Sequence, residues 1–455
     1  MRIFLCIATV IVSASCNKPN TTGDFYITDY GAKGDSLTLN TTAIQKAIDA
    51  CAAQGGGRVI FPVGKFISGT IVLRSNINYH FQNGAMLIGS PSVQNYNKPE
   101  GENNIMLIAY QQPAVVQAAL RVFIDGSNVT NVSFTGLGII DGNGKHFWDE
   151  AFKALERPEP WINFSNAKNI SIKEVTFRNA PSHVLRFAGS EQIVIDGIKI
   201  GNVPKSPNTD GIDLVDTKNV HISNSFISTG DDAICLKTDR TGVENVTVTN
   251  CIIESDDAAL KFGTGSKGYT RFCTFSNNII RNSRYGISLF MLEGGVFEHN
   301  HFSNMIISGG SRHANEYPIF IDVDKKRPDD TYGLVRNNTF SDLTIVTSGK
   351  ILITGRPEIP IENVLMSNIN LTLQNEADFS KAKKPRGNKN FPKLENSLDR
   401  APVSAHFTFG HINGLYMNNV TINYQNKSTR KDIDLLDVKN FQITNCHGND
   451  LSKLK

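Results

Sequence analysis

The sequence predicts an all-β fold, a single-domain right-handed parallel β-helix with an N-terminal amphipathic capping helix. Two observations carry this prediction. Related units of roughly 20 to 30 residues recur along the chain, and each unit contains only short strand-like stretches and turns. Such units stack on one another and share one continuous core. The 455 residues therefore indicate one long domain rather than several compact ones.

The repeated units share β-branched stretches punctuated by Asn, Ser, Asp or Gly. Examples are "KNVHISNSFISTG" from Lys218, "ENVTVTNCIIESD" from Glu244 and "IENVLMSNINLTL" from Ile361. No helical period lies between the stretches, which excludes βαβ repeats, and Leu is not the periodic residue, which argues against a leucine-rich repeat. Asn at matching turn positions suits left-handed backbone conformations and stacked side-chain amides.

The N-terminal end of the solenoid needs a cover, because an open terminal coil is an exposed sheet edge. In "TTAIQKAIDACAA" a helical period puts four apolar residues on one face, namely Ile44, Ala47, Ile48 and Cys51. Thr42 and Gln45 have the spacing of a capping box. We therefore expect an amphipathic helix that lies over the first coil.

The first residues have the layout of an export signal: Met1 and Arg2, the apolar run "IFLCIATVIV", then "SASC". The run is too short to cross a membrane. "SASC" resembles a bacterial lipoprotein processing site, which predicts lipidation of Cys16, with plain secretion as the alternative. We expect a signal over 1–16, a linker over 17–23 and the β-helix domain over 24–455. The expected location is the envelope of a Gram-negative bacterium, with membrane contact only through the lipid anchor.

Two longer stretches lack the repeat pattern and are expected to form loops over one face, about 91–119 and about 374–401. The second contains "KAKKPRGNK", which reads equally well as a substrate contact and as a solvated loop.

Charge and cysteine content exclude several classes of partner. Lys plus Arg number 46 against 43 Asp plus Glu, and a formal charge of +3 gives no reason to expect nucleic acid. The cysteines after the signal show no metal-ligand spacing and are expected as small core residues, namely Cys51, Cys235, Cys251, Cys273 and Cys446. We predict no metal and no other cofactor.

Two acidic pairs lie about one repeat apart. "NTDGIDL" carries Asp210 and Asp213, and "TGDDAICLK" carries Asp231 and Asp232. Adjacent coils are about 4.8 Å apart, so Asp210 and Asp231 are expected at nearly the same place on neighbouring coils. Carboxyl groups this close repel unless one stays protonated, and that arrangement supplies an acid and a base at one pH.

A lone Asp in a turn has a purely structural reading, because its carboxylate caps backbone amides. Asp35, Asp216 and Asp322 are assigned to that class. The doubled acid after Gly230 is different, since making a turn requires only one of the two carboxylates.

At this point the chain resembles glycoside hydrolase family 28, the polygalacturonase and rhamnogalacturonase group. "NTDGIDL" and "STGDDAICLK" are similar to its two acidic signatures, and "GIIDGNGKHFWD" is similar to its early strand motif. "ITDYGAKGDSLTLNTTAIQKAID" and "GGGRVIFPVGKFISGTIVL" are similar to its N-terminal region. The resemblance covers nearly everything after residue 24.

The resemblance implies an inverting hydrolase of pectin-type polysaccharide or its oligosaccharides. Asp231 would be the general acid, Asp210 and Asp232 would activate water, and Asn208 would orient the carboxylates, while Asp213 is expected to hold the turn. An inverting pair stands about 6.5 to 9.5 Å apart to admit the water. The two long insertions predict exo action, and the capped solenoid gives no reason to expect more than a monomer.

The match to the family fails at two positions. The usual Gly-His-Gly is missing after the acid pair, and the Arg-Ile-Lys pattern is "RYG", in which Arg284 remains and Gly286 replaces the Lys. Substrate charge would then be met by other cations, Arg186, Lys237 or Lys261.

Other candidate sugar contacts carry open alternatives. His183, about one turn before Asp210, is expected to bond the sugar or to be a satisfied core group, and Tyr285 is expected to stack on a sugar ring. Asp256 and Asp257 in "DDAALKFG" either extend the acidic stripe as a subsite or are duplicated turn residues.

Two competing functions stay open. A β-helical polysaccharide lyase would use Ca²⁺ and an Arg or Lys base, and it would leave an unsaturated product. A carbohydrate-binding solenoid would show no turnover, so an Asp231→Asn change would leave it unaffected but would slow a hydrolase about 10²-fold or more.

Overall fold

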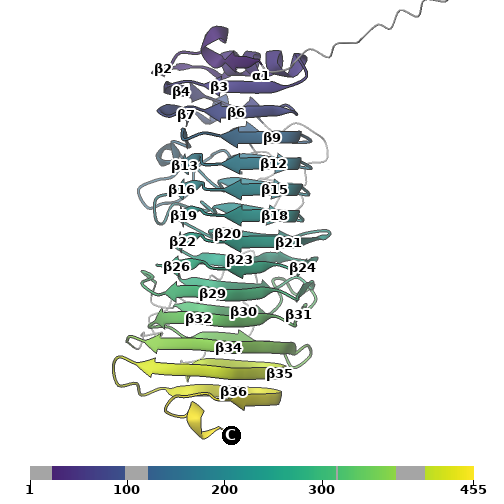
Figure 1. Ribbon diagram of the computed structural model, residues 1–455, viewed down its shortest axis with the longest axis vertical. Coiled ribbons are helices and arrows are strands. Elements are labelled where there is room, and N and C mark those ends of the chain that lie inside the picture. The colour runs from purple at the N-terminus through teal and green to yellow at the C-terminus, as the bar shows by residue number, and fades with distance from the viewer. Residues whose placement is uncertain (1–22, 98–120, 314–315, 376–404, 455) are drawn as a thin grey trace, which may run out of the picture.

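The structure is a computed structural model that describes residues 23–97, 121–313, 316–375 and 405–454. These residues wind into a right-handed parallel β-helix of 36 strands, with coils stacked along the long axis and the two ends of the chain at opposite ends of the stack (Figure 1). The predicted fold class is confirmed. The export signal with Cys16, the basic run and most of both insertions lie outside the described residues.

Three parallel sheets run along the stack, and sheet 1 begins one coil later than the other two. Sheet 1 carries the acidic motifs. Its strands in stacking order are β5 (Ile71–Val72), β8 (Ile124–Asp125), β11 (Ile162–Ser165), β14 (Leu185–Ala188), β17 (Ile212–Val215), β20 (Ile234–Thr238), β23 (Ala258–Ser266), β27 (Tyr285–Met291), β30 (Tyr317–Val323), β33 (Ile351–Thr354), and the first parts of β35 (Ala405–Tyr424) and β36 (Lys431–Thr444).

Sheet 2 faces the viewer in Figure 1. Its strands are β1 (Asp24–Tyr26), β3 (Gly57–Phe61), β6 (Ile77–Phe81), β9 (Thr130–Thr135), β12 (Lys168–Lys173), β15 (Glu191–Asp196), β18 (Lys218–Ser223), β21 (Gly242–Thr249), β24 (Tyr269–Arg271), β25 (Thr274–Ser276), β28 (Val296–Glu298), β31 (Leu334–Arg336), and parts of β29 (His301–Ser308), β32 (Thr339–Thr347), β34 (Ile361–Leu373), β35 and β36.

Sheet 3 completes each coil. Its strands are β2 (Asp35–Leu39), β4 (Gly64–Ser68), β7 (Ala85–Gly89), β10 (Ile139–Asp141), β13 (Thr176–Arg178), β16 (Lys199–Gly201), β19 (Phe226–Thr229), β22 (Ile252–Ser255), β26 (Ile279–Arg281), and the later parts of β29, β32, β34 and β35. Short 3-10 turns lie outside the sheets, at Ile27–Tyr30, Val93–Asn95, Gly144–His146 and Leu451–Lys453.

The core consists of inward side chains that lie in register on successive coils. Phe302 stacks between Phe275 and Phe340, with ring centroids 4.9 and 5.1 Å away. The described cysteines are free and buried, as expected for small core residues. No helix among the described residues is long and apolar enough to cross a membrane.

Asparagines at the corners form the predicted ladders. Asn219 and Asn245 have φ values of 57° and 59°, and the Asn245 amide donates to Asn219 Oδ1 at 3.0 Å. Asn304 donates in the same way to Asn277. Asn tolerates the left-handed conformation and satisfies its amide on the next coil, which explains its recurrence at the turns.

The N-terminal helix α1 (Thr41–Ala53) packs against the first coil and buries the four residues predicted for its apolar face, namely Ile44, Ala47, Ile48 and Cys51. The predicted capping box is wrong. The helix begins at Thr41 after Asn40, and the Gln45 amide instead bonds both backbone groups of Val72 on β5. Gln45 therefore bonds a strand of the neighbouring coil, whereas the local spacing predicted that it would cap its own helix.

The lone aspartates behave as predicted in two of three cases. Asp35 accepts the backbone N–H groups of Leu37 and Thr38, and Asp216 accepts those of residues 239–241 on the next coil. For Asp322 the turn assignment is wrong, because the residue lies buried in β30 of sheet 1 opposite Phe290.

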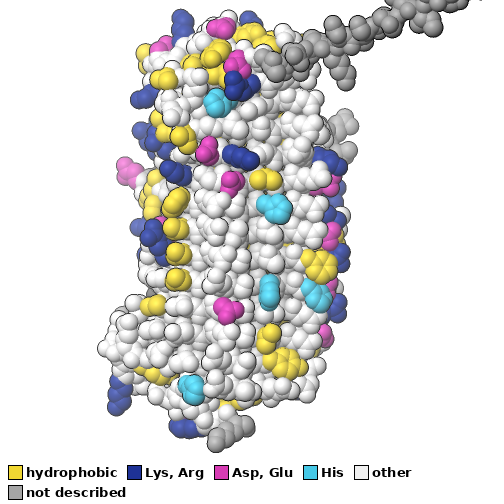
Figure 2. Space-filling model, viewed as in Figure 1, with side chains coloured by type: hydrophobic (Ala, Val, Ile, Leu, Met, Phe, Trp, Pro, Cys, Tyr) yellow, Lys and Arg dark blue, Asp and Glu magenta, His cyan; other side chains and the backbone are white. Residues whose placement is uncertain are grey.

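One apolar column remains on the outside of sheet 3. Phe226, Ile252, Ile279 and Ile306 lie in register on four successive coils and are partly or well exposed. Figure 2 shows a column of hydrophobic side chains on this flank.

Candidate active site

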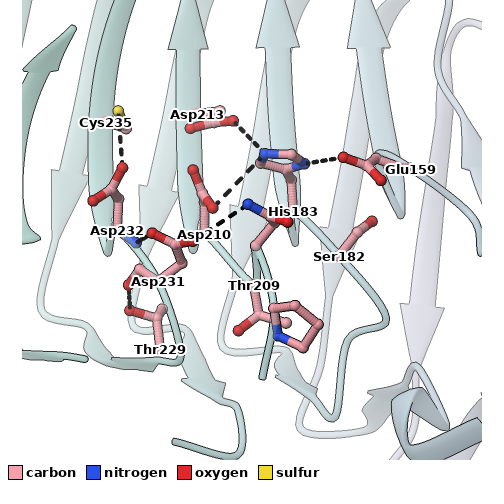
Figure 3. Close-up of polar contacts among 12 residues, drawn as sticks. Glu159, Ser182, His183, Thr209, Asp210, Asp213, Thr229, Asp231, Asp232 and Cys235 are labelled. Carbon is pink, nitrogen blue, oxygen red and sulfur yellow. Dashed lines mark hydrogen bonds and ion pairs between the residues drawn. The ribbon is translucent and has the colours of Figure 1, made fainter. Parts of the chain in front are cut away.

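The two acidic motifs meet where neighbouring coils enter sheet 1. Ile212 of β17 pairs with Ile234 of β20, so Asp210 is aligned with Asp232, and Asp231 precedes it by one residue. The N–H of Gly211 donates to the carbonyl oxygen of Asp232 at 2.8 Å, which fixes the two coils together. Figure 3 shows the side chains of Asp210, Asp231 and Asp232 beside one another. The predicted juxtaposition of remote acids is confirmed.

Asp210 is held as a carboxylate. The Lys237 ammonium lies 3.0 Å from Asp210 Oδ2 and 2.9 Å from Asp213 Oδ1. Burial alone would raise the pKa of Asp210, but Lys237, His183 and Lys261 outweigh it and lower this pKa to about 2. Asp213 does not hold the turn as predicted. It lies in β17, is fully buried, and shares Lys237 with Asp210.

Asp231 differs from Asp210 in exposure and in proton affinity. It is partly exposed, and its Oδ1 accepts the N–H of Asp232 at 3.1 Å. Desolvation and the charges of Asp210, Asp232 and Asp257 raise the pKa of Asp231 well above its ordinary value. The site therefore places a protonated carboxyl group next to an ionised one, which is the combination required for general acid and base catalysis.

Asp232 ionises near neutrality. Its Oδ2 lies 2.6 Å from the Lys261 ammonium. Burial, with Asp210 and Asp257, raises the pKa of Asp232 to about 7, although Lys261 and Lys237 oppose this rise. Lys237 and Lys261, predicted as substrate contacts, therefore contact the acids themselves.

Asn208 contacts one of the acids that it was predicted to orient, Asp231. Its Nδ2 donates to Asp231 Oδ2 at 3.4 Å, and its backbone adopts a φ of 52°. His183 is buried, with Nε2 lying 3.7 Å from Asp210 Oδ1 and 3.9 Å from Asp213 Oδ2 (Figure 3). His183 thus faces the acids from the preceding coil.

The remaining predicted contacts lie on the same sheet. Arg186 is 1% exposed and opposes Asp213 in the ladder between β14 and β17. Tyr285 does not offer the open face expected for sugar stacking, because it is 5% exposed and packs on Tyr317 with centroids 5.3 Å apart. The ring of Tyr285 is buried in the hydrophobic packing of β27 against β30.

The second acidic doublet forms ion pairs. Arg284 Nη1 lies 3.3 Å from Asp257 Oδ1, and Arg312 forms a bidentate pair with Asp256. Asp257 has a carboxylate oxygen within 4.8 Å of ligand atoms of both Asp231 and Asp232. Asp257 therefore adds a third carboxyl group beside Asp231 and Asp232, whereas Asp256 pairs with Arg312.

A family model for glycosyl hydrolases family 28 matches residues 109–389, which is more than half of the chain. The chain belongs to glycosyl hydrolases family 28. Two of the family 28 motifs identified in the sequence, "NTDGIDL" and "STGDDAICLK", supply the acids described above.

Known relatives agree with this membership. An exo-poly-alpha-D-galacturonosidase of Dickeya chrysanthemi is 30% identical over 253 residues, covering 46% of this chain and 41% of that protein. The chain spans about two fifths of the length of such curated relatives.

Two solved structures share the fold. A family 28 exopolygalacturonase of Yersinia enterocolitica superposes with a TM-score of 0.67 at 19% identity, covering 93% of this chain and 78% of that one. A polygalacturonase from Erwinia carotovora ssp. carotovora gives a TM-score of 0.62 at 22% identity, covering 79% of this chain and 96% of that one.

Two functional residues of this family 28 chain carried no usable sequence signal. Arg157 is buried and donates to the carbonyl oxygens of Pro181 and Pro207 and to Asn208 Oδ1, at 3.0, 2.6 and 3.0 Å. Its Nε also contacts Glu159, which lies 3.9 Å from His183 Nδ1. Both residues come from the irregular segment between β10 and β11, where no repeat predicts the position of a side chain.

Among the residues that the structure describes, two sets of groups have ligand atoms within 4.8 Å of one another, His183 with Asp210 and Asp213, and Asp231 with Asp232 and Asp257. Lysine ammonium groups already occupy these carboxylates, Lys237 in the first set and Lys261 in the second. Lys237 contacts Asp210 Oδ2 and Asp213 Oδ1, whereas His183 faces the other oxygens, Asp210 Oδ1 and Asp213 Oδ2.

Proposed function

We propose that the protein is an inverting glycoside hydrolase that cleaves pectin-type polysaccharide or its oligosaccharides. The observation that carries the proposal is that Asp210, bound to Lys237, and the partly exposed Asp231 come together on neighbouring coils. Asp231, the more exposed acid, protonates the leaving oxygen. Asp210 and Asp232 activate water on the opposite face of the sugar, which requires room for that water between the groups.

The other polar residues tune these roles. Lys237 keeps Asp210 ionised, and Lys261 opposes the rise in the pKa of Asp232. Asn208 orients Asp231. The name of the Dickeya relative supports exo action on a galacturonan-type chain.

The test is product analysis on homogalacturonan, rhamnogalacturonan and their oligosaccharides. We expect new reducing ends without the ultraviolet absorbance of an unsaturated sugar, and NMR of the nascent product should show inverted anomeric configuration. Early mixed oligomers would contradict exo action, and an unsaturated product would replace the hydrolase with a lyase.

Two variants complete the test. Asp231→Asn should slow turnover about 10²-fold or more, whereas a binding solenoid would be indifferent. Asp342→Asn is the matched control, because Asp342 is an exposed corner residue on another coil, has a φ of 55°, and accepts an amide from Asn368.

We further propose that the chain is exported and lipidated at Cys16, and that it acts as a monomer. The sequence of the first 16 residues supports export and lipidation, and the capped solenoid gives no reason to expect more than one chain. Metabolic labelling with a fatty-acid analogue should mark the wild type but not Cys16→Ser. Light scattering should give the mass of one chain.

A further inference from the structure

The cations beside the acid cluster already face carboxylates of the same chain. Lys237 contacts Asp210 and Asp213, and Lys261 contacts Asp232. The turn after the acid pair repeats the pattern with two arginine pairs, Arg284 with Asp257 and Arg312 with Asp256. A sugar carboxylate bound here would have to compete with an internal carboxylate for each of these cations. Binding a uronate at such a place carries a desolvation cost, because each of these four cations already faces a carboxylate.

The backbone also leaves no room for another cation at Gly286. A Cβ atom at this position would lie 2.6 Å from the carbonyl oxygen of Pro318 and 2.9 Å from Cγ2 of Ile307. Both contacts are shorter than a side chain tolerates. Position 286 of β27 therefore presents no side chain to the outer face of sheet 1.

An apolar cluster lies on the outside of sheet 1 beside this position. Tyr285, Tyr317, Phe320 and Leu352 are buried together from β27, β30 and β33, with Ala258. Phe290 packs against this cluster, 5.6 Å from Tyr285 and 4.9 Å from Phe320 between centroids, and stays partly exposed. The open ring of this cluster is thus that of Phe290.

Two contacts join the cluster directly to the acids. The Lys261 ammonium, bound to Asp232, lies 5.3 Å from the centroid of Phe290. Arg284, paired with Asp257, lies 4.8 Å from the ring of Tyr285. The face of an aromatic ring is electron-rich, so it favours C–H groups and disfavours a carboxylate.

Resting on the proposed function, we propose that the sugar bound next to the acids on the C-terminal side of sheet 1 is uncharged. Phe290 supplies the face on which its C–H groups lie, and the Asp257–Arg284 and Asp256–Arg312 pairs exclude a uronate. A pectin-derived oligosaccharide with a neutral sugar, such as a deoxyhexose or hexose, at this position is the substrate class selected.

A binding experiment tests this specificity without turnover. Asp231→Asn keeps the uncharged state of Asp231, so calorimetry on this variant can compare a galacturonate oligosaccharide with its carboxyl-reduced counterpart, in which a neutral CH₂OH group replaces each carboxylate. We expect the neutral ligand to bind about tenfold tighter or more, which is about 1.4 kcal/mol. Equal or tighter binding of the acidic ligand overturns the proposal, as does failure of the neutral ligand to bind.

Two substitutions in the Asp231→Asn background locate the effect. Phe290→Ala should weaken neutral binding about tenfold, and Phe290→Tyr should restore it. Asp256→Asn leaves Arg312 without its carboxylate and should narrow the preference for the neutral ligand about tenfold, whereas Asp342→Asn should not change it. An unchanged preference in both Phe290→Ala and Asp256→Asn would contradict the assignment.

Hydrolysis separates the two proposals. A protein that prefers the neutral ligand yet cleaves no glycan retains this specificity and loses the proposed hydrolase function. A protein that hydrolyses galacturonate oligomers and binds them better than their reduced forms retains the function and loses this specificity.

Discussion

The ammonium group of Lys261 lies 2.6 Å from Oδ2 of Asp232, and both side chains are almost buried. The positive charge of Lys261 opposes the rise in pKa at both Asp231 and Asp232. The pH range in which Asp231 is protonated while Asp232 is ionised therefore depends on Lys261, a residue of the next coil.

Replacing Lys261 by Met should move the pH profile to higher pH. Loss of the positive charge raises the pKa of Asp232 from about 7, so the acidic limb of kcat/KM should move up by about one unit, and the alkaline limb set by Asp231 should follow. Lys261→Arg keeps the charge and should leave the limbs in place. Lys267→Met, which removes a lysine paired with Asp239, is the distant control. An unmoved acidic limb in folded Lys261→Met would contradict the role of this pair.

Asp257→Asn should act in the opposite direction. The Asp257 charge raises the pKa of both Asp231 and Asp232, so its removal lowers both. Asp231 then loses its proton at lower pH, and activity on the alkaline side should fall. Titration of kcat against pH measures the change, and a shift towards alkaline pH would contradict this electrostatic role of Asp257.

Arg157→Lys should reduce kcat about tenfold with little change in KM. Guanidinium groups only donate, so Arg157 turns Asn208 Oδ1 towards itself and leaves Nδ2 facing Asp231. Lysine keeps the charge but not the fork that bonds Asn208 and two carbonyl groups. Steady-state kinetics and the alkaline pH limb together check this positioning role. A pure stability effect would lower the melting temperature without altering the kinetics of the folded protein.

Each hydrogen bond between corner asparagines should contribute to the free energy of unfolding. Asn245→Ala removes the bond to Asn219 and places a Cβ-bearing residue without a local hydrogen bond at a φ of 59°. We expect a loss of about 1 to 2 kcal/mol in the free energy of unfolding. Asn245→Gly loses the same bond without the backbone strain and should lose less. Denaturant unfolding of the two variants measures the difference, and a neutral Asn245→Ala would contradict the account.

Periodicity made much of this molecule predictable. The spacing of the repeats placed Asp210 and Asp231 on neighbouring coils, and the helical period of 41–53 identified the capping face of α1. The first inference uses the coil repeat, which recurs many times in the sequence, and the second uses the helical period of a single segment. The one-residue offset that aligns Asp210 with Asp232 followed only from the register of β17 and β20.

Residues whose partners lie outside the period were not predictable in the same way. Arg157 reaches Asn208 from a segment without repeats, and Gln45 bonds Val72 instead of capping its helix. The sequence predicted a turn role for Asp213, but this residue lies in β17 and its carboxylate contacts Lys237. In each case the partner is chosen by a contact between elements, and the local sequence does not encode the partner's position.

The parallel register of sheet 1 makes the molecule extensible. Each coil bonds only to the coil above and the coil below, and the residues that we assign to cleavage occupy a few coils in the middle of the stack. Adding or deleting a whole coil near either end would change the length of the outer surface by about 4.8 Å while the centre kept its geometry. A scaffold of this kind can be fitted to longer or shorter glycans without redesigning its chemistry.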